Sequence, residues 1–196
     1  MNKELKEALE KIEFSKKEYN LQNPHIIFPG EDCLIIEGGG GGTTKRYLDH
    51  IVNHGGRLIT LDMCTKPGDK IYMKEEHVGS GGKGDYSEKR KLYKMLIEDK
   101  VISKCFEWHD GDIYTFFKNR PKLEIDYYFD DATHESKYLL PLFELIIPMC
   151  KIGAIIGTHD TRDTQMKEFV DFLRKHEKLK IVQDRNNSLF CKVIKK

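Results

Sequence analysis

The sequence predicts an α/β protein whose sheet is mostly parallel and twisted, with helices on both faces and an antiparallel β-hairpin at the C-terminus. Short apolar runs alternate with segments of helical periodicity along most of the chain. Parallel strands require crossover connections, which the intervening helices supply. The last two alternating runs flank an Asn-containing turn, as the strands of a hairpin do.

The elements of the N-terminal part follow from these periods. We expect a helix over 2–18, a strand over 33–37, a helix over 43–54 and a strand over 57–62. The first helix is amphipathic, so it should pack against the domain rather than act in chemistry. The first strand is a continuous apolar run between turn residues, which is typical of a strand buried on both faces.

The segment 63–87 is rich in glycine and contains Pro67. Loops of this length are uncommon inside compact domains and are often functional or disordered. We expect a lid over a site, with a merely disordered insertion as the alternative.

The C-terminal part continues the alternation. The sequence predicts helices over 88–99, 113–119, 135–147 and 164–176, strands over 105–109, 125–130 and 152–160, and hairpin strands over 179–184 and 188–194. Pro141 should fray or shift the early part of its helix, because proline lacks the N–H that a helix interior uses.

Length and charge limit the possible classes of protein. The chain of 196 residues has room for one ordinary domain, which we place at 31–196 after an N-terminal helix and linker over 1–30. There are 33 Lys and Arg residues against 32 Asp and Glu residues, so the net charge is +1. This balance disfavours a protein that binds nucleic acid mainly through its phosphates.

The chain also lacks the signals of membrane insertion and export. No run approaches the ~18 apolar residues that span a bilayer, and the charged N-terminus has no apolar signal-peptide core. Five cysteines stand far apart without a CxxC pair, which suits reduced thiols rather than disulfides or structural zinc. We expect a cytoplasmic protein that does not bind a membrane.

A glycine-rich loop follows the first predicted strand. Ligands of open α/β sheets bind at the carboxyl ends of the strands, where the strand order reverses. Glu37 stands there before five glycines, 38–42, and these let a ligand approach the backbone and the helix N-terminus. Asp62 ends the second strand 20 residues after Gly42, the distance at which an acid commonly binds ribose hydroxyls. A flexible turn is the alternative, and the absence of GxxxxGK[ST] disfavours a nucleoside triphosphatase.

A second group of polar residues lies near the ends of two later strands. It comprises Asp130, Asp131, His134, His159 and Asp160. Carboxylates and imidazoles gathered at one edge can remove a proton from a hydroxyl and hold a divalent cation. Each residue also has a structural alternative, because the acids could cap helices, His134 could be merely exposed, and His159 could be a structural histidine.

Two other patterns favour structural roles. His50 and His54 have the spacing of metal ligands, but they stand at a helix end, where cationic side chains favour the dipole. The large aromatic residues within the strands should fill the core: Trp108, Tyr127, Tyr128 and Phe129.

The segments EGGGGGTT, ITLD, HDGD, FDDATH and GAIIGTHDT together resemble the class I S-adenosylmethionine-dependent methyltransferases. Within this family, the sequence resembles the branch of small-molecule O-methyltransferases related to the catechol, macrocin and cephalosporin-cluster enzymes. The resemblance covers about 33–194. It implies a Rossmann-like fold with the C-terminal hairpin at the sheet edge, S-adenosyl-L-methionine as cofactor and transferase activity.

The resemblance also implies roles for individual residues. The family segment FIDGDH corresponds to FDDATH, so Asp131 and His134 match while Thr133 replaces the second acid. His134 would be the general base, and Asp131, His159 and Asp160 would hold Mg²⁺, as in the metal-dependent relatives. The residues implied to bind the cofactor are Glu37, Gly38, Gly39, Gly41, Thr43, Asp62, Asp112 and Asp131, with Asp62 on the ribose and Asp112 near the adenine.

The sequence therefore predicts methyl transfer to a hydroxyl of a small molecule, such as a sugar or a secondary metabolite. An in-line displacement at a sulfonium carbon needs alignment of donor and acceptor and loss of the acceptor proton. One alternative is an NAD-type oxidoreductase, since a glycine loop and a distal acid serve both cofactors, although no Tyr-x-x-x-Lys pair is evident. The other is a methyltransferase-like binding domain without catalysis. A homo-oligomer is left open.

Overall fold

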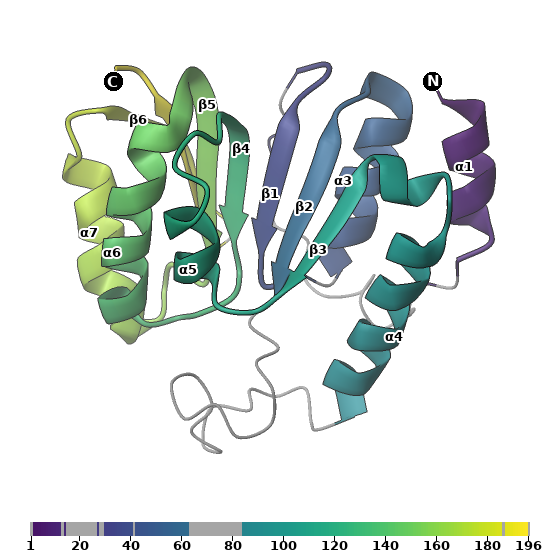
Figure 1. The fold of residues 1–196 in the computed structure, drawn as a ribbon. Helices are drawn as coiled ribbons and strands as arrows, with labels where there is room; N and C mark the ends of the chain where they lie inside the picture. Colours follow the sequence, from purple (N-terminus) through teal and green to yellow (C-terminus); the bar gives the residue numbers. More distant parts are fainter. Residues whose placement is uncertain are drawn as a thin grey trace.

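The computed structural model describes residues 2–12, 14, 27, 30–40, 42–62, 84–185 and 187–195, with the backbone alone at 42, 62 and 84–89. Its centre is a seven-stranded sheet in the order β3-β2-β1-β4-β5-β7-β6 (Figure 1). The strands are β1 (Leu34–Gly38), β2 (Arg57–Asp62), β3 (Phe106–Asp110), β4 (Ile125–Asp130), β5 (Cys150–His159), β6 (Leu179–Arg185) and β7 (Ser188–Val193). The first five are parallel, and β7 runs antiparallel to both β5 and β6.

Helices cover both faces of this sheet (Figure 1). One face carries α1 (Lys3–Glu10), α3 (Gly42–His54) and α4 (Gly84–Glu98), and the other carries α5 (Ile113–Lys118), α6 (Ser136–Ile146) and α7 (Lys167–Lys175). Each face has its own apolar core, and β1 contributes Ile35 to one and Ile36 to the other, both fully buried. This burial on both faces explains why β1 is a continuous apolar run rather than an alternating one.

The predicted fold class is confirmed, and strands β2 and β4 have the predicted bounds. α1 is shorter than the predicted helix: it ends at Glu10, and residues 15–18 lie outside the described residues. It packs as expected, because Leu5, Ala8 and Leu9 are buried. α6 continues through Pro141, so that proline does not end the helix.

The predicted loop over 63–87 lies mostly outside the described residues, so its role as a lid stays a prediction. Its C-terminal limit was wrong, because α4 already begins at Gly84. No proline or glycine follows Gly84 within α4, so nothing in the sequence interrupts the helix there. Likewise, the predicted helix over 164–176 begins as a short 3₁₀ turn, Thr164–Met166, before α7.

Within the described part of the chain, no helix has both the length and the apolar character needed to cross a membrane. Four cysteines lie in this part, and none of them forms a disulfide there: Cys33, Cys105, Cys150 and Cys191. Cys64 lies outside it.

Candidate active site

The strand order reverses between β1 and β4, since the chain builds β2 and β3 on one side of β1 and then crosses to β4 on the other. The glycine loop leaves β1 at this point, and the second polar group follows β4 and β5. The two stretches are bonded directly, because the N–H of Asp131 donates to the carbonyl of Gly38 over 2.9 Å. The structure therefore places both predicted groups in one place, at the edge where α/β proteins bind ligands.

At Gly39 and Gly40 of the loop, other parts of the protein lie too close to the backbone for a side chain to fit. Gly39 has a φ of 85°, and a Cβ there would overlap the main chain of Asp131. A Cβ at Gly40 would overlap the hydroxyl of Tyr93. Gly41 lies outside the described residues. Gly39 thus packs against the segment that follows β4, and Gly40 packs against Tyr93 of α4.

Glu37 is completely buried beneath this loop. Its Oε2 accepts hydrogen bonds from the hydroxyls of Thr44 (2.8 Å) and Thr60 (3.1 Å), and its Oε1 accepts one from Thr43. The carboxylate therefore ties the start of α3 and the middle of β2 to the end of β1. Any contribution of Glu37 and Thr43 to cofactor binding would come through the shape of the loop.

Asp62 and Asp112 were the two acids predicted to contact adenosine. Asp62 is the last residue of β2, and Leu61 pairs in register with Gly38, so its backbone lies beside the start of the glycine loop. Asp112 lies between β3 and α5 and is the N-cap of α5. Its Oδ2 accepts hydrogen bonds from the N–H (2.9 Å) and the hydroxyl (2.5 Å) of Thr115. Asp112 therefore stabilises the start of α5, whether or not it also binds adenosine.

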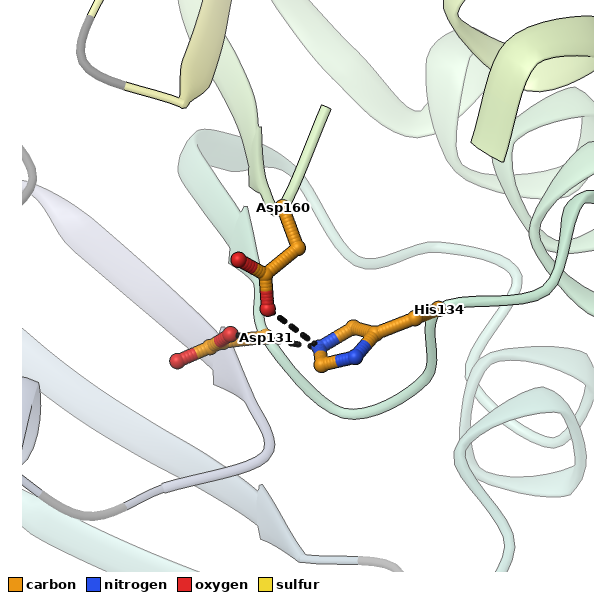
Figure 2. Close-up of side chains that lie close together, drawn as sticks. All are labelled: Asp131, His134 and Asp160. Atoms are coloured by element: carbon orange, nitrogen blue, oxygen red, sulfur yellow. Dashed lines mark ion pairs between the residues drawn. The ribbon is translucent and has the colours of Figure 1, made fainter. Parts of the chain in front are cut away.

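Four side chains of the second group converge beyond β4 and β5. Figure 2 shows His134 pointing toward the carboxylates of Asp131 and Asp160. His134 Nε2 lies 3.1 Å from Asp160 Oδ2 and 3.7 Å from Asp131 Oδ1. His159 Nδ1 lies 3.3 Å from Asp131 Oδ1 and 3.5 Å from Asp160 Oδ1. We call these four residues the His–Asp cluster.

The His–Asp cluster stabilises its own charges. Burial disfavours the charged form of Asp131, but the two imidazoles outweigh it and hold the pKa of that carboxyl below its usual value. In turn, the Asp131 carboxylate raises the pKa of both His134 and His159 above the ordinary histidine value, against the opposing effect of burial. The imidazoles can therefore accept and hold a proton near neutral pH.

Asp130 does not join this cluster, although the sequence grouped it there. It is 1% exposed and points into the protein, where the hydroxyl of Tyr128 donates to its Oδ1 over 2.9 Å. Its Oδ2 is buried without a hydrogen-bond partner, an absence that holds for the described residues. Burial raises the pKa of the Asp130 carboxyl to about 7.

The structure excludes the helix-cap alternatives for these acids. The N-cap residue of α6 is Glu135, and the 3₁₀ turn before α7 is capped by Asp163, whose side chain accepts from the N–H of Gln165. Asp130, Asp131 and Asp160 occupy neither position. They must therefore be explained by other contacts.

Asn187 is a site residue that the sequence analysis missed. It lies in the turn between β6 and β7, and its Nδ2 donates to Asp160 Oδ1 over 2.6 Å. Its own Oδ1 accepts from the N–H of Arg162 over 2.8 Å. Both Asn187 and Asp160 have left-handed backbone, with φ of 60° and 55°. The only signal in the sequence was an Asn in a hairpin turn, a residue that tolerates this conformation.

The residues predicted to be structural are placed elsewhere. His50 and His54 stack with their ring centroids 4.5 Å apart at the C-terminal end of α3, and His54 lines a cavity of about 590 Å³ there. That end of α3 leads into the start of β2, so it lies at the opposite edge of the sheet from the His–Asp cluster. The fully buried aromatic residues of β4 belong to the core as predicted: Tyr127, Tyr128 and Phe129.

Comparisons with known proteins agree with this architecture. The sequence matches no protein-family model and no curated protein. Its structure, however, is similar to an O-methyltransferase from Bacillus cereus in complex with SAH, with a TM-score of 0.58, 15% identity, and coverage of 100% of this chain and 92% of the other. It is also similar to MycE from the mycinamycin biosynthetic pathway, in complex with Mg and SAH, with a TM-score of 0.55, 14% identity, and coverage of 100% of this chain and 56% of MycE. The chain therefore has the fold of the class I S-adenosylmethionine-dependent O-methyltransferases.

Proposed function

We propose that the protein is an S-adenosylmethionine-dependent methyltransferase that acts on a hydroxyl of a small molecule. The observation that carries the proposal is the direct contact between the glycine loop and the His–Asp cluster, made by the hydrogen bond from Asp131 to Gly38. Methyl transfer requires a donor site and a proton-accepting site side by side. SAH, bound by the Bacillus cereus neighbour and by MycE, is the demethylated form of this donor.

The groups around the glycine loop suit such a cofactor. The first turn of α3, which starts at Gly42, has main-chain N–H groups that could donate hydrogen bonds to the carboxylate of the cofactor. Asp62 at the end of β2 suits ribose hydroxyls. The residues that would hold the cofactor are Gly38, Gly39, Gly41, Asp62, Asp112 and Asp131, with Glu37 and Thr43 fixing the loop from below.

His134 would take the proton of the acceptor hydroxyl. S-adenosylmethionine, when bound, supplies an activated methyl group on a sulfonium centre. The His134 side chain is 43% exposed, so an acceptor can reach it, and Asp160 and Asp131 orient its ring. The neighbouring carboxylate of Asp131 raises the pKa of His134, which makes its imidazole a stronger proton acceptor.

A divalent cation could assist at the same place. Asp131, His159 and Asp160 are the ligands implied by the resemblance, and the ligand atoms of Asp131, His134 and Asp160 lie within 4.8 Å of one another. A cation held there would lower the pKa of a coordinated hydroxyl and position it. Two carboxylates suit Mg²⁺, whereas imidazole suits it less well.

A small-molecule acceptor is favoured by the charge balance and by one neighbour. MycE has been crystallised with Mg, SAH and mycinamycin VI, and this structure has a TM-score of 0.51, 16% identity, and coverage of 84% of this chain and 45% of MycE. A protein of Clostridium thermocellum described as an rRNA methylase has a TM-score of 0.55, 12% identity, and coverage of 86% of this chain and 90% of the other. The net charge of +1 disfavours such an acceptor here.

The proposal is tested by incubating the chain with S-adenosylmethionine labelled in the methyl group and a panel of sugar and secondary-metabolite hydroxyl compounds. Transfer of label to a hydroxyl supports the proposal. Calorimetric titration with S-adenosylmethionine and NAD separates the alternatives, since binding of NAD alone would indicate an oxidoreductase. Binding of the methyl donor without transfer to any acceptor would favour a binding domain.

A further inference from the structure

The two histidines and two carboxylates of the His–Asp cluster form an unusual donor set for a magnesium enzyme. Each imidazole nitrogen lies within 3.7 Å of an oxygen of both carboxylates. All four side chains retain solvent exposure, from 20% for His159 to 43% for His134. An ion that reaches both carboxylates therefore meets an imidazole nitrogen as well.

The spacing of these atoms is close to that of ligands around one ion. Two ligands bound about 2.1 Å from a cation, at about 90° to 109° from each other, lie about 3.0 to 3.4 Å apart. The separations between the imidazole nitrogens and the carboxylate oxygens are 3.1, 3.3, 3.5 and 3.7 Å. The ligand atoms of Asp131, His134 and Asp160 all lie within 4.8 Å of one another, so these three side chains are close enough to share one ion, and His159 lies beside Asp131 and Asp160.

We infer that the His–Asp cluster binds a first-row transition-metal dication, such as Co²⁺ or Zn²⁺, in preference to Mg²⁺. The inference rests on the proposed function only in treating this cluster as the active site. A bound dication would take the lone pair of His134 Nε2, so the ion, rather than that imidazole, would then promote loss of the acceptor proton by lowering the pKa of the hydroxyl. Imidazole is a common ligand of zinc, iron, nickel and copper, whereas Mg²⁺ takes oxygen ligands and keeps several waters. A site of carboxylates and water alone would suit Mg²⁺, but here each carboxylate has two imidazole nitrogens within 3.7 Å.

Asn187 supports this assignment by fixing one of the carboxylates. Its side-chain N–H holds Asp160 Oδ1, and its backbone carbonyl accepts from the N–H of Thr161 over 3.3 Å. Carboxylates that bind metals are commonly held by such hydrogen bonds from a second layer of residues. The competing explanation is that protonated imidazoles simply neutralise the two carboxylates, without any ion.

The test is a titration of the full chain, freed of metal by chelation, with Co²⁺, followed by its visible absorption. We expect one Co²⁺ per chain and a coordination spectrum that persists in about a thousandfold excess of Mg²⁺ but is displaced by Zn²⁺. The double variant His134→Ala/His159→Ala should weaken Co²⁺ binding at least ~100-fold. The loss of a residue that only hydrogen-bonds to a metal ligand usually weakens binding less than this.

The matched control is His50→Ala/His54→Ala, which removes the stacked histidine pair at the other edge and should leave Co²⁺ binding unchanged. If the His134/His159 variant does not fold, as judged by thermal unfolding, the Gln substitutions at both positions replace it. The inference is overturned if Co²⁺ does not bind, if Mg²⁺ at equal concentration displaces it, or if the control variant alone loses it. SAH binding is measured on the same metal-free sample, so that failure of the proposed function is seen separately.

Discussion

Glu37 and Asp131 are acids at the carboxyl ends of two adjacent strands, β1 and β4, yet their surroundings are opposite. Glu37 is completely buried and is held by three neutral threonine hydroxyls. Asp131 is 36% exposed and lies between two imidazoles. Both acids lie at the same edge of the sheet. Glu37 stabilises the loop from within the protein, whereas Asp131 remains accessible to a substrate or an ion.

The largest effect is expected on turnover, from a substitution in the exposed His–Asp cluster. His134→Ala should lower turnover at least ~100-fold, the usual contribution of a general base, while the affinity for S-adenosylmethionine stays nearly the same. Steady-state kinetics and calorimetry on the same sample measure the two quantities. His176→Ala, a histidine at the end of α7, is the control. Normal turnover in His134→Ala would retire its assignment as the base.

Asp130 is a third acid at this edge, and it should respond to pH as a buried group that forms no ion pair within the described part of the chain. Its pKa is raised to about 7 in the folded protein, whereas an unfolded Asp titrates near 3.9. Between these values the folded state binds the extra proton, so this group lowers stability as pH rises from about 4 to 7, with no further loss above that. At pH 7.5 the cost is on the order of 4 kcal/mol.

Asp130→Asn should therefore raise the melting temperature at pH 7.5 by several degrees more than at pH 4.5. The partly exposed Asp171 on α7 offers a charge-matched control, Asp171→Asn, in which no such pH-dependent difference is expected. An equal shift at both pH values would show that Asp130 is ionised in the folded protein.

The buried side of the comparison predicts a loss of stability. Glu37→Ala leaves the hydroxyls of Thr44 and Thr60 without their acceptor inside the protein, at a cost of about 2 kcal/mol. This corresponds to a fall of about 4 to 8 °C in melting temperature for a chain of this size. Asp131→Ala at the exposed site should cost less than half as much. If Asp131→Ala proves the more destabilising of the two, the contrast between these acids is wrong.

The smallest effect is expected at Asn187. Asn187→Gly keeps the left-handed backbone that glycine accepts and removes the amide that holds Asp160. Co²⁺ affinity should fall about 10-fold, as expected for loss of a second-layer hydrogen bond, while the melting temperature changes little. An unchanged affinity would mean that Asp160 is held without Asn187.

Much of the fold could be predicted because its signals are local. β4 is an apolar run ending in an acid, and both of its predicted limits agree with the structure. The strand predicted over 152–160 was found two residues too late at its start, because β5 begins at Cys150. The start of α4 was missed because glycine is a weak helix former, and the sequence alone does not show where the helix pattern overrides it.

The sequence could predict which residues follow the strands that end at the candidate site, but not the direction of each side chain. The sequence placed Asp131, His134 and Asp160 together because parallel strands end at one edge. It wrongly added Asp130, because the sequence does not show that the side chain of this last residue of β4 turns into the protein toward Tyr128. Asn187, Thr44 and Thr60 were missed because each has its partner on another element of the chain.

The most direct test of the account is a crystal structure of the full chain with SAH. The account predicts that SAH lies along the loop of residues 38–42, with its ribose at Asp62 and its sulfur facing His134. A structure in which SAH binds elsewhere, or in which the chain's own side chains fill the space between that loop and Asp62, would contradict it.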